Sequence, residues 1–81
     1  MKITVKLYAV LREAAEQSEL ALEVAAGTTC GEILAHLAKE FPSVLQILGR
    51  SFVALNGEYV DRYAYVSAGD EVAVLPPVSG G

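Results

Sequence analysis

The sequence predicts an α+β fold in which one main helix packs on a mixed β-sheet and a flexible tail follows the last strand. Near the start of the chain, two segments alternate apolar and polar residues, which is the period of a half-buried strand. An apolar stripe at helical spacing follows them. An Asn-Gly pair then separates two further strand-like runs. The predicted order is strand, strand, helix and three more strands.

The first two strands are predicted over residues 2–10 and around residues 20–24. Their alternating apolar residues are Ile3, Val5, Leu7 and Ala9 in the first strand and Leu20, Leu22 and Val24 in the second. Residues 11–17 between them are rich in helix formers but too few to form a stable helix alone, so we expect a helical turn. The two strands are expected to pair antiparallel.

The main helix is expected to begin after Thr29. Thr29 and Glu32 have the spacing of a capping box, in which each side chain binds a free backbone N–H at the helix start. The apolar residues that follow at helical spacing are Ile33, Leu34, Leu37, Ala38 and Phe41. Pro42 should end the helix, because it has no N–H and restricts the residue before it. A short second helical turn is expected over residues 43–48.

The remaining strands are predicted in the C-terminal half of the chain. Apolar residues 52–55 precede Asn56-Gly57, which favours a tight hairpin because both residues tolerate a positive φ. Residues 58–60 would form the return strand. Gly69-Asp70 marks another turn, and residues 71–75 are expected to form the last strand.

Composition and charge exclude several classes of protein. The 81 residues fit one domain, and a net charge of −4 with six scattered basic residues argues against nucleic acid binding, which needs a basic face. No apolar run has the length of a membrane span, and the first residues read as a strand, so a cytoplasmic protein is expected. With 53% hydrophobic residues, so small a domain should leave apolar surface exposed for partners.

The last six residues differ in kind from the rest. Pro76-Pro77 cannot continue a central strand, and Gly80-Gly81 has the greatest backbone freedom. We therefore predict a domain over residues 1–75 and an extended functional tail over residues 76–81. Such a tail could reach about 20 Å. A disordered terminus without a function is the alternative, although this arrangement of residues is more specific than disorder requires.

Two side chains are candidates for other chemistry. Cys30 lies at the predicted helix N-terminus, where a thiolate is favoured and could carry a persulfide. No second Cys or adjacent His accompanies it, so we favour a small, half-buried residue at a helix start. His36 lies four residues from both Glu32 and Glu40, but one His with two solvent-facing Glu does not close a ligand set. We expect a solvated helix face and no metal.

The remaining candidate is the main-chain carboxyl group of Gly81. It is ionised at neutral pH and is therefore unreactive as an electrophile, so another protein must activate it, for example as an acyl-adenylate. Gly81 suits such chemistry because no Cβ shields its carbonyl group, and Gly80 would let the tail thread a narrow channel. Leu75 and Val78 are apolar with little core left to join, so we expect both to contact a partner.

Three segments carry a resemblance to a known family. They are residues 69–81 (GDEVAVLPPVSGG), residues 7–13 (LYAVLRE) and residues 53–60 (VALNGEYV). They resemble the C-terminus, the first strand with its turn, and the central hairpin of the small subunit of molybdopterin synthase, the MoaD family of sulfur carriers. The resemblance spans the whole chain, and the tail is its most specific part.

This resemblance implies a ubiquitin-like β-grasp fold and a route for sulfur. An E1-like enzyme of the MoeB type would adenylate Gly81 with ATP, and a sulfur donor protein would convert the carboxyl group to a thiocarboxylate. The tail would then enter the large catalytic subunit, of the MoaE type, within a heterotetramer. The residues that map onto the inserted tail are Pro76, Pro77, Val78, Ser79 and Gly80. No permanently bound cofactor and no activity of the chain alone are implied, and Leu75 stands where many relatives carry Phe.

Other functions stay open on the sequence. A sulfur carrier for thiamine or cysteine synthesis would share the terminus, although thiamine carriers are usually shorter and lack the Pro-Pro step. A ubiquitin-like modifier conjugated to lysines and a plain interaction module are further alternatives. A thiocarboxylate on the purified chain would favour a carrier, whereas isopeptide-linked adducts would favour a modifier.

Overall fold

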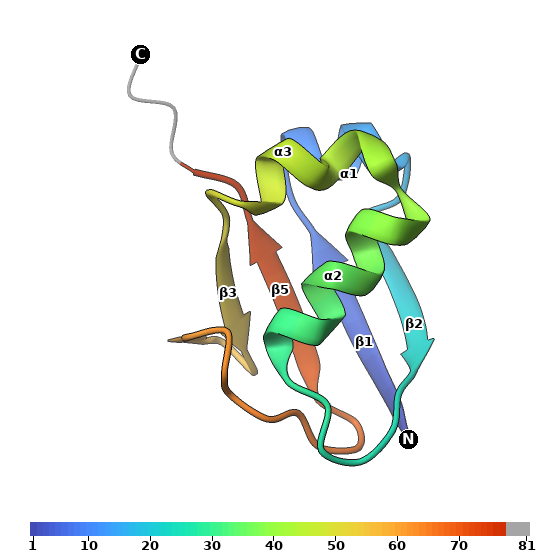
Figure 1. Cartoon of the computed structure of the whole chain (residues 1–81), viewed down its shortest axis with the longest axis vertical. Coiled ribbons are helices and arrows are strands. Elements are labelled where there is room, and N and C mark those ends of the chain that lie inside the picture. Colours follow the sequence, from blue (N-terminus) through green and yellow to red (C-terminus); the bar gives the residue numbers. More distant parts are fainter. Residues whose placement is uncertain (78–81) are drawn as a thin grey trace.

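A computed structural model describes residues 1–77, which form a five-stranded mixed sheet with its main helix packed across it (Figure 1). The strands are β1 (Lys2–Leu7), β2 (Glu19–Glu23), β3 (Phe52–Leu55), β4 (Glu58–Val60) and β5 (Glu71–Leu75). The helices are α1 (Val10–Ala15), α2 (Cys30–Glu40), the 3-10 turn η1 (Pro42–Val44) and α3 (Leu45–Leu48). The strand order is β2-β1-β5-β3-β4, with β1 and β5 parallel and the other pairs antiparallel. This arrangement confirms the predicted ubiquitin-like β-grasp fold.

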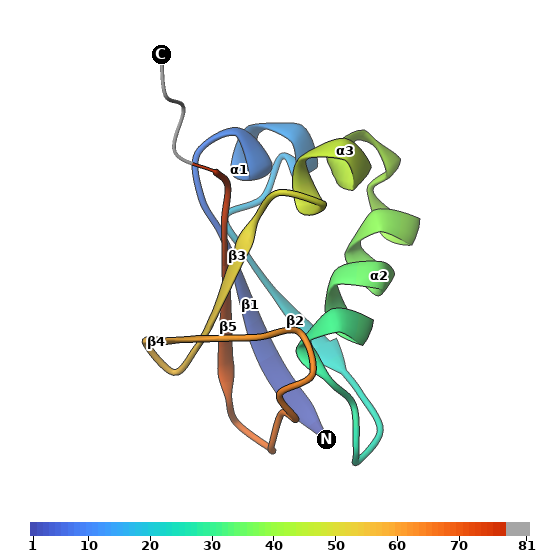
Figure 2. The same cartoon turned by 60° about the vertical axis from the view of Figure 1, so that its left-hand side comes forward.

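The hydrophobic core lies between the sheet and α2, and no helix of residues 1–77 covers the opposite face of the sheet (Figure 2). The strand residues that point into the core are Ile3, Val5, Leu7, Val53, Val72 and Val74. Helix α2 contributes Ile33, Leu34 and Leu37, as its apolar stripe predicts. Because successive strand residues point to opposite faces, Ala73 and Leu75 lie on the open face.

Local signals in the sequence set the ends of several elements. The capping box is present: the backbone N–H of Glu32 donates to Thr29 Oγ1 at 3.2 Å, and the backbone N–H of Thr29 donates to Glu32 Oε1 at 2.9 Å. Helix α2 ends at Glu40, immediately before the Phe41-Pro42 step. Asn56 and Gly57 have φ values of 50° and 88°, as expected for the tight hairpin.

The predicted extension of the first strand to residue 10 is wrong. β1 ends at Leu7, and Ala9, predicted on the buried face, is exposed with a φ of 50°. This turn of the backbone starts α1 at Val10 and brings Leu11 into the core, where it is fully buried. Burial of one large apolar side chain stabilises the fold by about 2 kcal/mol, which offsets the local strain at Ala9.

None of the helices within residues 1–77 has the length and apolar character needed to span a bilayer. β5 ends at Leu75, the residue at which the predicted domain ends, although the division into domain and tail stays a prediction. Val78, Ser79, Gly80 and Gly81 lie outside the described residues.

Candidate functional site

The end of β5 lies beside the start of β3, where the chain leaves the sheet toward its C-terminus (Figure 1). Phe52 and Leu75 are register partners in the antiparallel β3–β5 pair. Ala54 pairs with Tyr59 across the hairpin. Since strand residues two apart share a face, Phe52, Tyr59 and Leu75 all lie on the face of the sheet that α2 does not cover.

These side chains border a hollow of about 680 Å³, which we name the tail-root hollow. Its lining residues are Ser51, Phe52, Val53, Tyr59, Val60, Asp61, Arg62, Tyr63, Leu75 and Pro76. Most of its lining is apolar. The sequence led us to expect exposed apolar surface, and the hollow places part of it directly at the root of the predicted tail.

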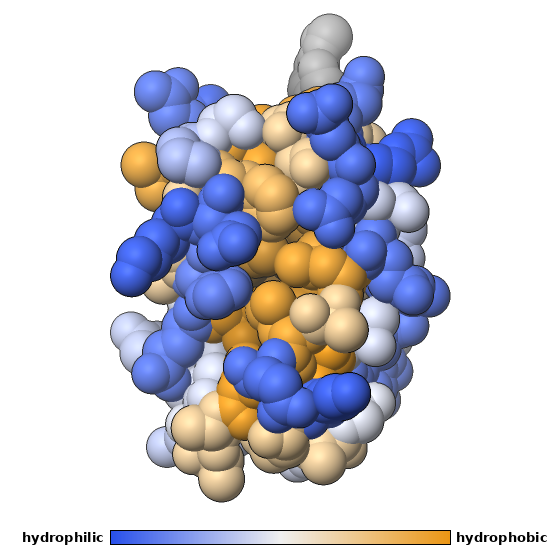
Figure 3. All heavy atoms as spheres, turned by 90° about the vertical axis from the view of Figure 1, so that its right-hand side faces the viewer, coloured by the Kyte–Doolittle hydropathy of each residue, from blue (hydrophilic) through white to orange (hydrophobic). Residues whose placement is uncertain are grey.

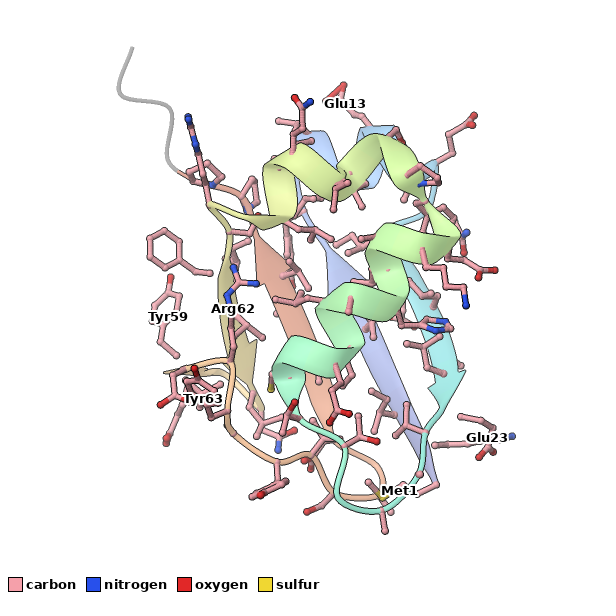
Figure 4. The ribbon with its side chains drawn as sticks, in the orientation of Figure 1. Met1, Glu13, Glu23, Tyr59, Arg62 and Tyr63 are labelled. Carbon is pink, nitrogen blue, oxygen red and sulfur yellow. The ribbon has the colours of Figure 1, made fainter. Side chains whose placement is uncertain are left out.

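Three aromatic side chains give the tail-root hollow its shape. Phe52 and Tyr59 stack edge to face, with ring centroids 6.1 Å apart and an interplanar angle of 73°. Both rings are more than half exposed, and Tyr63 is 83% exposed. Figure 4 shows Tyr59 and Tyr63 projecting on the same side of the molecule, next to β3. Exposed aromatic side chains around an apolar hollow are typical of a protein-docking surface.

Arg62 holds the wall of the hollow in place. Its Nη2 donates to the carbonyl oxygens of Leu48 and Ser51, at 2.7 Å and 3.2 Å, so it joins the end of α3 to the start of β3. Its own carbonyl oxygen accepts a hydrogen bond of 2.8 Å from the backbone N–H of Gly31. The side chain of Arg62 therefore fixes the loop that carries Tyr63 to the end of α3, and its carbonyl oxygen fixes the same loop to the start of α2 (Figure 4).

Gly31 permits this contact by its lack of a side chain. A Cβ on Gly31 would lie 3.1 Å from the carbonyl oxygen of Arg62. Gly31 lies inside α2 and is not among the residues with a positive φ. Its role is thus to permit the close approach of a loop to the first turn of α2, which no local sequence pattern predicts.

The predicted site residues fall into two groups. Leu75 and Pro76 line the tail-root hollow, and Pro76 and Pro77 border a second hollow beside α1 and α3 with Val10 and Arg50. Leu75 and Pro76 are half-buried, so the root of the tail packs on the body of the domain. The predictions for Val78, Ser79, Gly80 and Gly81 lie outside the described residues.

The two alternative side chains lie away from the tail root. Cys30 is fully buried at the start of α2, and burial, together with the nearby Asp61 and Asp70 charges, raises the pKa of its thiol. The helix start thus does not favour a thiolate here. His36 is exposed on α2, and residues 1–77 contain no group of three His, Cys, Asp or Glu side chains that could hold a metal ion.

Phe52 was not predicted as a site residue from the sequence. Part of the signal was present, because a two-residue Asn-Gly turn pairs residue 54 with residue 59 and so puts Phe52 and Tyr59 on one face. The pairing of Phe52 with Leu75 joins segments 23 residues apart, and no local pattern predicts it.

The five-stranded fold, the apolar hollow at Leu75 and a sequence that ends in Gly80-Gly81 define a ubiquitin-like β-grasp protein of the carrier or modifier type. The chain belongs to the ThiS family, because the sequence model of that family matches residues 5–81. It is 37% identical over 81 residues to a molybdopterin synthase sulfur carrier subunit from Arabidopsis thaliana, covering 100% of this chain and 84% of that protein. The resemblance seen in the sequence is thereby confirmed.

Solved structures give the same fold. SAMP1 from Haloferax volcanii, a small archaeal modifier protein, superimposes with a TM-score of 0.88 at 31% identity over 100% of both chains. A chain of the BexX/CysO complex from Amycolatopsis orientalis superimposes with a TM-score of 0.73 at 26% identity, covering 98% of this chain and 99% of that one.

Proposed function

We propose that this chain is the sulfur carrier subunit of a molybdopterin synthase. In this proposal Gly81 carries sulfur as a thiocarboxylate and donates it to a pterin precursor inside a large catalytic subunit. The observation that carries the proposal is the tail-root hollow, which gathers exposed aromatic side chains where the chain leaves β5 toward Gly80-Gly81. Identity of 37% to a protein with this role, along the whole chain, supports it.

The chemistry requires activation by a second protein. An oxygen of the ionised Gly81 carboxylate attacks the α-phosphorus of ATP, and pyrophosphate leaves. The terminal sulfur of a persulfide on a donor protein then attacks the acyl carbon, and AMP leaves. A thiol of the donor protein attacks the donor-bound sulfur of the resulting acyl disulfide, so a disulfide forms on the donor and the Gly81 thiocarboxylate is released. ATP binds to the E1-like activating enzyme of the MoeB type in this scheme, so the carrier holds no permanent cofactor. The carrier supplies a reachable carboxyl group and a surface that both partners recognise.

The large catalytic subunit, of the MoaE type, docks at the tail-root hollow in this proposal. Docking there buries Phe52, Tyr59 and Leu75, and the tail extends from Leu75 into the active site of that subunit. Fixing the root of the tail matters because the terminal group must meet its substrate with an error of about 1 Å or less. The Amycolatopsis relative, whose structure is a complex with another protein, is consistent with such an assembly.

Intact mass spectrometry tests the carrier function. The chain is incubated with an E1-like enzyme of the MoeB type, ATP and a sulfur source. We expect a mass gain equal to the replacement of one oxygen by one sulfur. A chain that lacks Gly81 is the matched control and should gain no mass. A mass gain that is lost on treatment with a thiol reductant would instead indicate a persulfide on Cys30. The absence of any mass gain would contradict the proposal.

A protein modifier is the second candidate, because SAMP1 shares 31% identity and the whole length of the fold. Conjugation would join Gly81 to a lysine of another protein through an isopeptide bond. No Lys or Arg follows Arg62 in the chain, so trypsin would leave residues 63–81 attached to the target lysine. Detection of that branched peptide in extracts of the source organism would favour the modifier. The thiocarboxylate alone would favour the carrier.

A further inference from the structure

The edge strand β2 lies on the opposite edge of the sheet from β4. Among residues 1–77, which the structure describes, β2 pairs with β1 alone. Figure 3 looks onto this edge and shows an apolar stripe that runs along the molecule between rows of polar side chains. The partly buried apolar side chains of these segments include Leu20 and Leu22 from β2, Val24 directly after β2, Ala38 from α2 and Phe41 directly after α2.

The backbone of β2 offers hydrogen-bonding groups at this edge. Met1 and Val24 exchange two hydrogen bonds, at 2.7 Å and 2.8 Å, and the backbone N–H of Leu7 donates to Ser18 at 2.9 Å. Antiparallel pairs alternate between residues that bond across the ladder and residues that do not. The N–H and C=O groups of Glu19, Ala21 and Glu23 therefore point away from β1. An extended segment laid along β2 would bond to them.

The side chains of β2 divide between the two faces. Leu22 of β2 and Val24, which follows the strand, point to the α2 side and line a hollow of about 220 Å³ together with Ile33 and His36. Glu23 and Glu32 also line this hollow. An added strand would place every second side chain at this hollow. Apolar side chains suit those positions, because each would cover the exposed part of a leucine or valine.

The other face of β2 specifies the charge of the added strand. Glu19 and Glu23 flank Ala21 there, and β1 presents Lys6 opposite Glu19 and Lys2 opposite Glu23. A strand with Lys or Arg opposite Glu19 and Glu23 would continue the alternation of positive and negative charges across the sheet on the outer side of β2. The N-terminal amine of Met1 lies 3.3 Å from Glu23 Oε2. The Glu23 side chain is still 68% exposed, so its carboxylate can pair with a further cation. A second copy of the chain, paired antiparallel about Ala21, would set Glu19 opposite Glu23, which is repulsive.

We propose that β2 accepts an extended segment of a partner protein as a sixth strand. That segment carries Lys or Arg opposite Glu19 and Glu23, and its alternate apolar side chains lie in the groove between β2 and α2. This surface is separate from the tail-root hollow, so the carrier can bind a basic strand while its tail is engaged elsewhere.

The probe is the acetylated and amidated peptide Ser-Lys-Val-Thr-Val-Lys-Ser, which has the same pattern in either direction along β2. Its matched control replaces both Lys by Glu. With the full chain labelled by ¹⁵N, we expect the Lys peptide to shift the amide signals of Glu19, Ala21 and Glu23. The Glu peptide should bind at least about fivefold more weakly at low salt. Equal binding of both peptides, shifts centred on Phe52 and Tyr59, or no shift at several millimolar peptide would overturn the proposal.

Two variants separate the backbone from the charges. Ala21→Pro removes the central outward N–H and leaves the bonds of Leu20 and Leu22 to β1, so it should abolish binding while the amide signal of Val24, which donates to Met1, stays in place. Glu19→Lys combined with Glu23→Lys keeps the backbone and should reverse the preference, so that the Glu peptide binds more tightly. An unchanged preference in this double variant would contradict the proposal even if the proline variant did not fold. A chain ending at Leu75 should bind the Lys peptide as the full chain does.

Discussion

Phe52 and Leu75 lie opposite each other across β3 and β5, on the face of the sheet left open by α2. We expect Leu75→Asp to weaken binding to the large catalytic subunit by at least about tenfold, because an unpaired charge at a buried interface costs several kcal/mol. Titration calorimetry measures the change. Phe52→Asp should behave alike, because the two side chains border the same hollow.

Leu45→Asp is the matched control for these two substitutions. Leu45 is 60% exposed on α3 and lies outside the tail-root hollow, so this substitution adds the same charge at another exposed apolar position. Affinity for the large subunit should stay within about twofold of the unsubstituted chain. If Leu45→Asp weakens binding as strongly as Leu75→Asp, net charge rather than the hollow controls the affinity.

Gly31→Ala should destabilise the fold although alanine is the better helix former. The new Cβ would lie 3.1 Å from the Arg62 carbonyl oxygen, so the loop that carries Tyr63 must shift. We expect a loss of about 1–2 kcal/mol in the free energy of unfolding, or several degrees in Tm. Gly49→Ala is the control, because its Cβ meets nothing closer than 3.9 Å and its φ is −60°. It should be neutral or slightly stabilising, and equal losses at both glycines would refute the close-approach argument.

Cys30→Ala should leave thiocarboxylate formation and sulfur transfer close to the level of the unsubstituted chain. The Cys30 thiol is fully buried, so no partner reaches it in the folded domain. In the unsubstituted chain, iodoacetamide should label Cys30 only as fast as the domain opens. A folded Cys30→Ala protein that fails to transfer sulfur would point to a persulfide route.

Ionisation of the same thiol should make the free energy of unfolding depend on pH. Burial raises the pKa of Cys30, so the unfolded chain releases this proton at a lower pH than the folded chain does. The stability contributed by the neutral thiol is complete below the ordinary thiol pKa and is lost as the pH rises above it. Urea unfolding between neutral and alkaline pH should therefore show a smaller loss of stability for Cys30→Ala than for the unsubstituted chain.

The position of the terminal carboxyl group should be critical under the proposed function. One alanine added after Gly81 extends the tail by about 3.3 Å and puts a methyl group beside the reacting carbonyl carbon. Thiocarboxylate formation and sulfur transfer should collapse, while thermal unfolding stays unchanged. Normal transfer by the extended chain, with mass spectrometry showing that it was not trimmed back to Gly81, would exclude the terminal-carboxyl mechanism.

Local signals in the sequence determined most of the secondary structure. The Thr29–Glu32 capping box, the stop at Pro42 and the Asn56-Gly57 hairpin each depend on contacts within a few residues, so their chemistry could be predicted without the fold. The tail was predicted in the same way, from the Pro-Pro and Gly-Gly steps alone, and it stays a prediction. The first strand was predicted too long, because its alternation continues to Ala9 and the burial of Leu11 that turns the chain is a tertiary effect.

Only the tertiary structure decided where the candidate site lies and what surrounds it. Phe52 meets Leu75, and Gly31 meets Arg62, through pairings between segments more than 20 residues apart. Nothing in either local sequence encodes such a partner, since a strand pairs with whichever edge the packed core presents to it. For the same reason the unfilled edge of β2 becomes visible only once the order of all five strands is known. The sequence thus determined most of the helices and strands through local signals, whereas the packing of the core determined which surfaces they form.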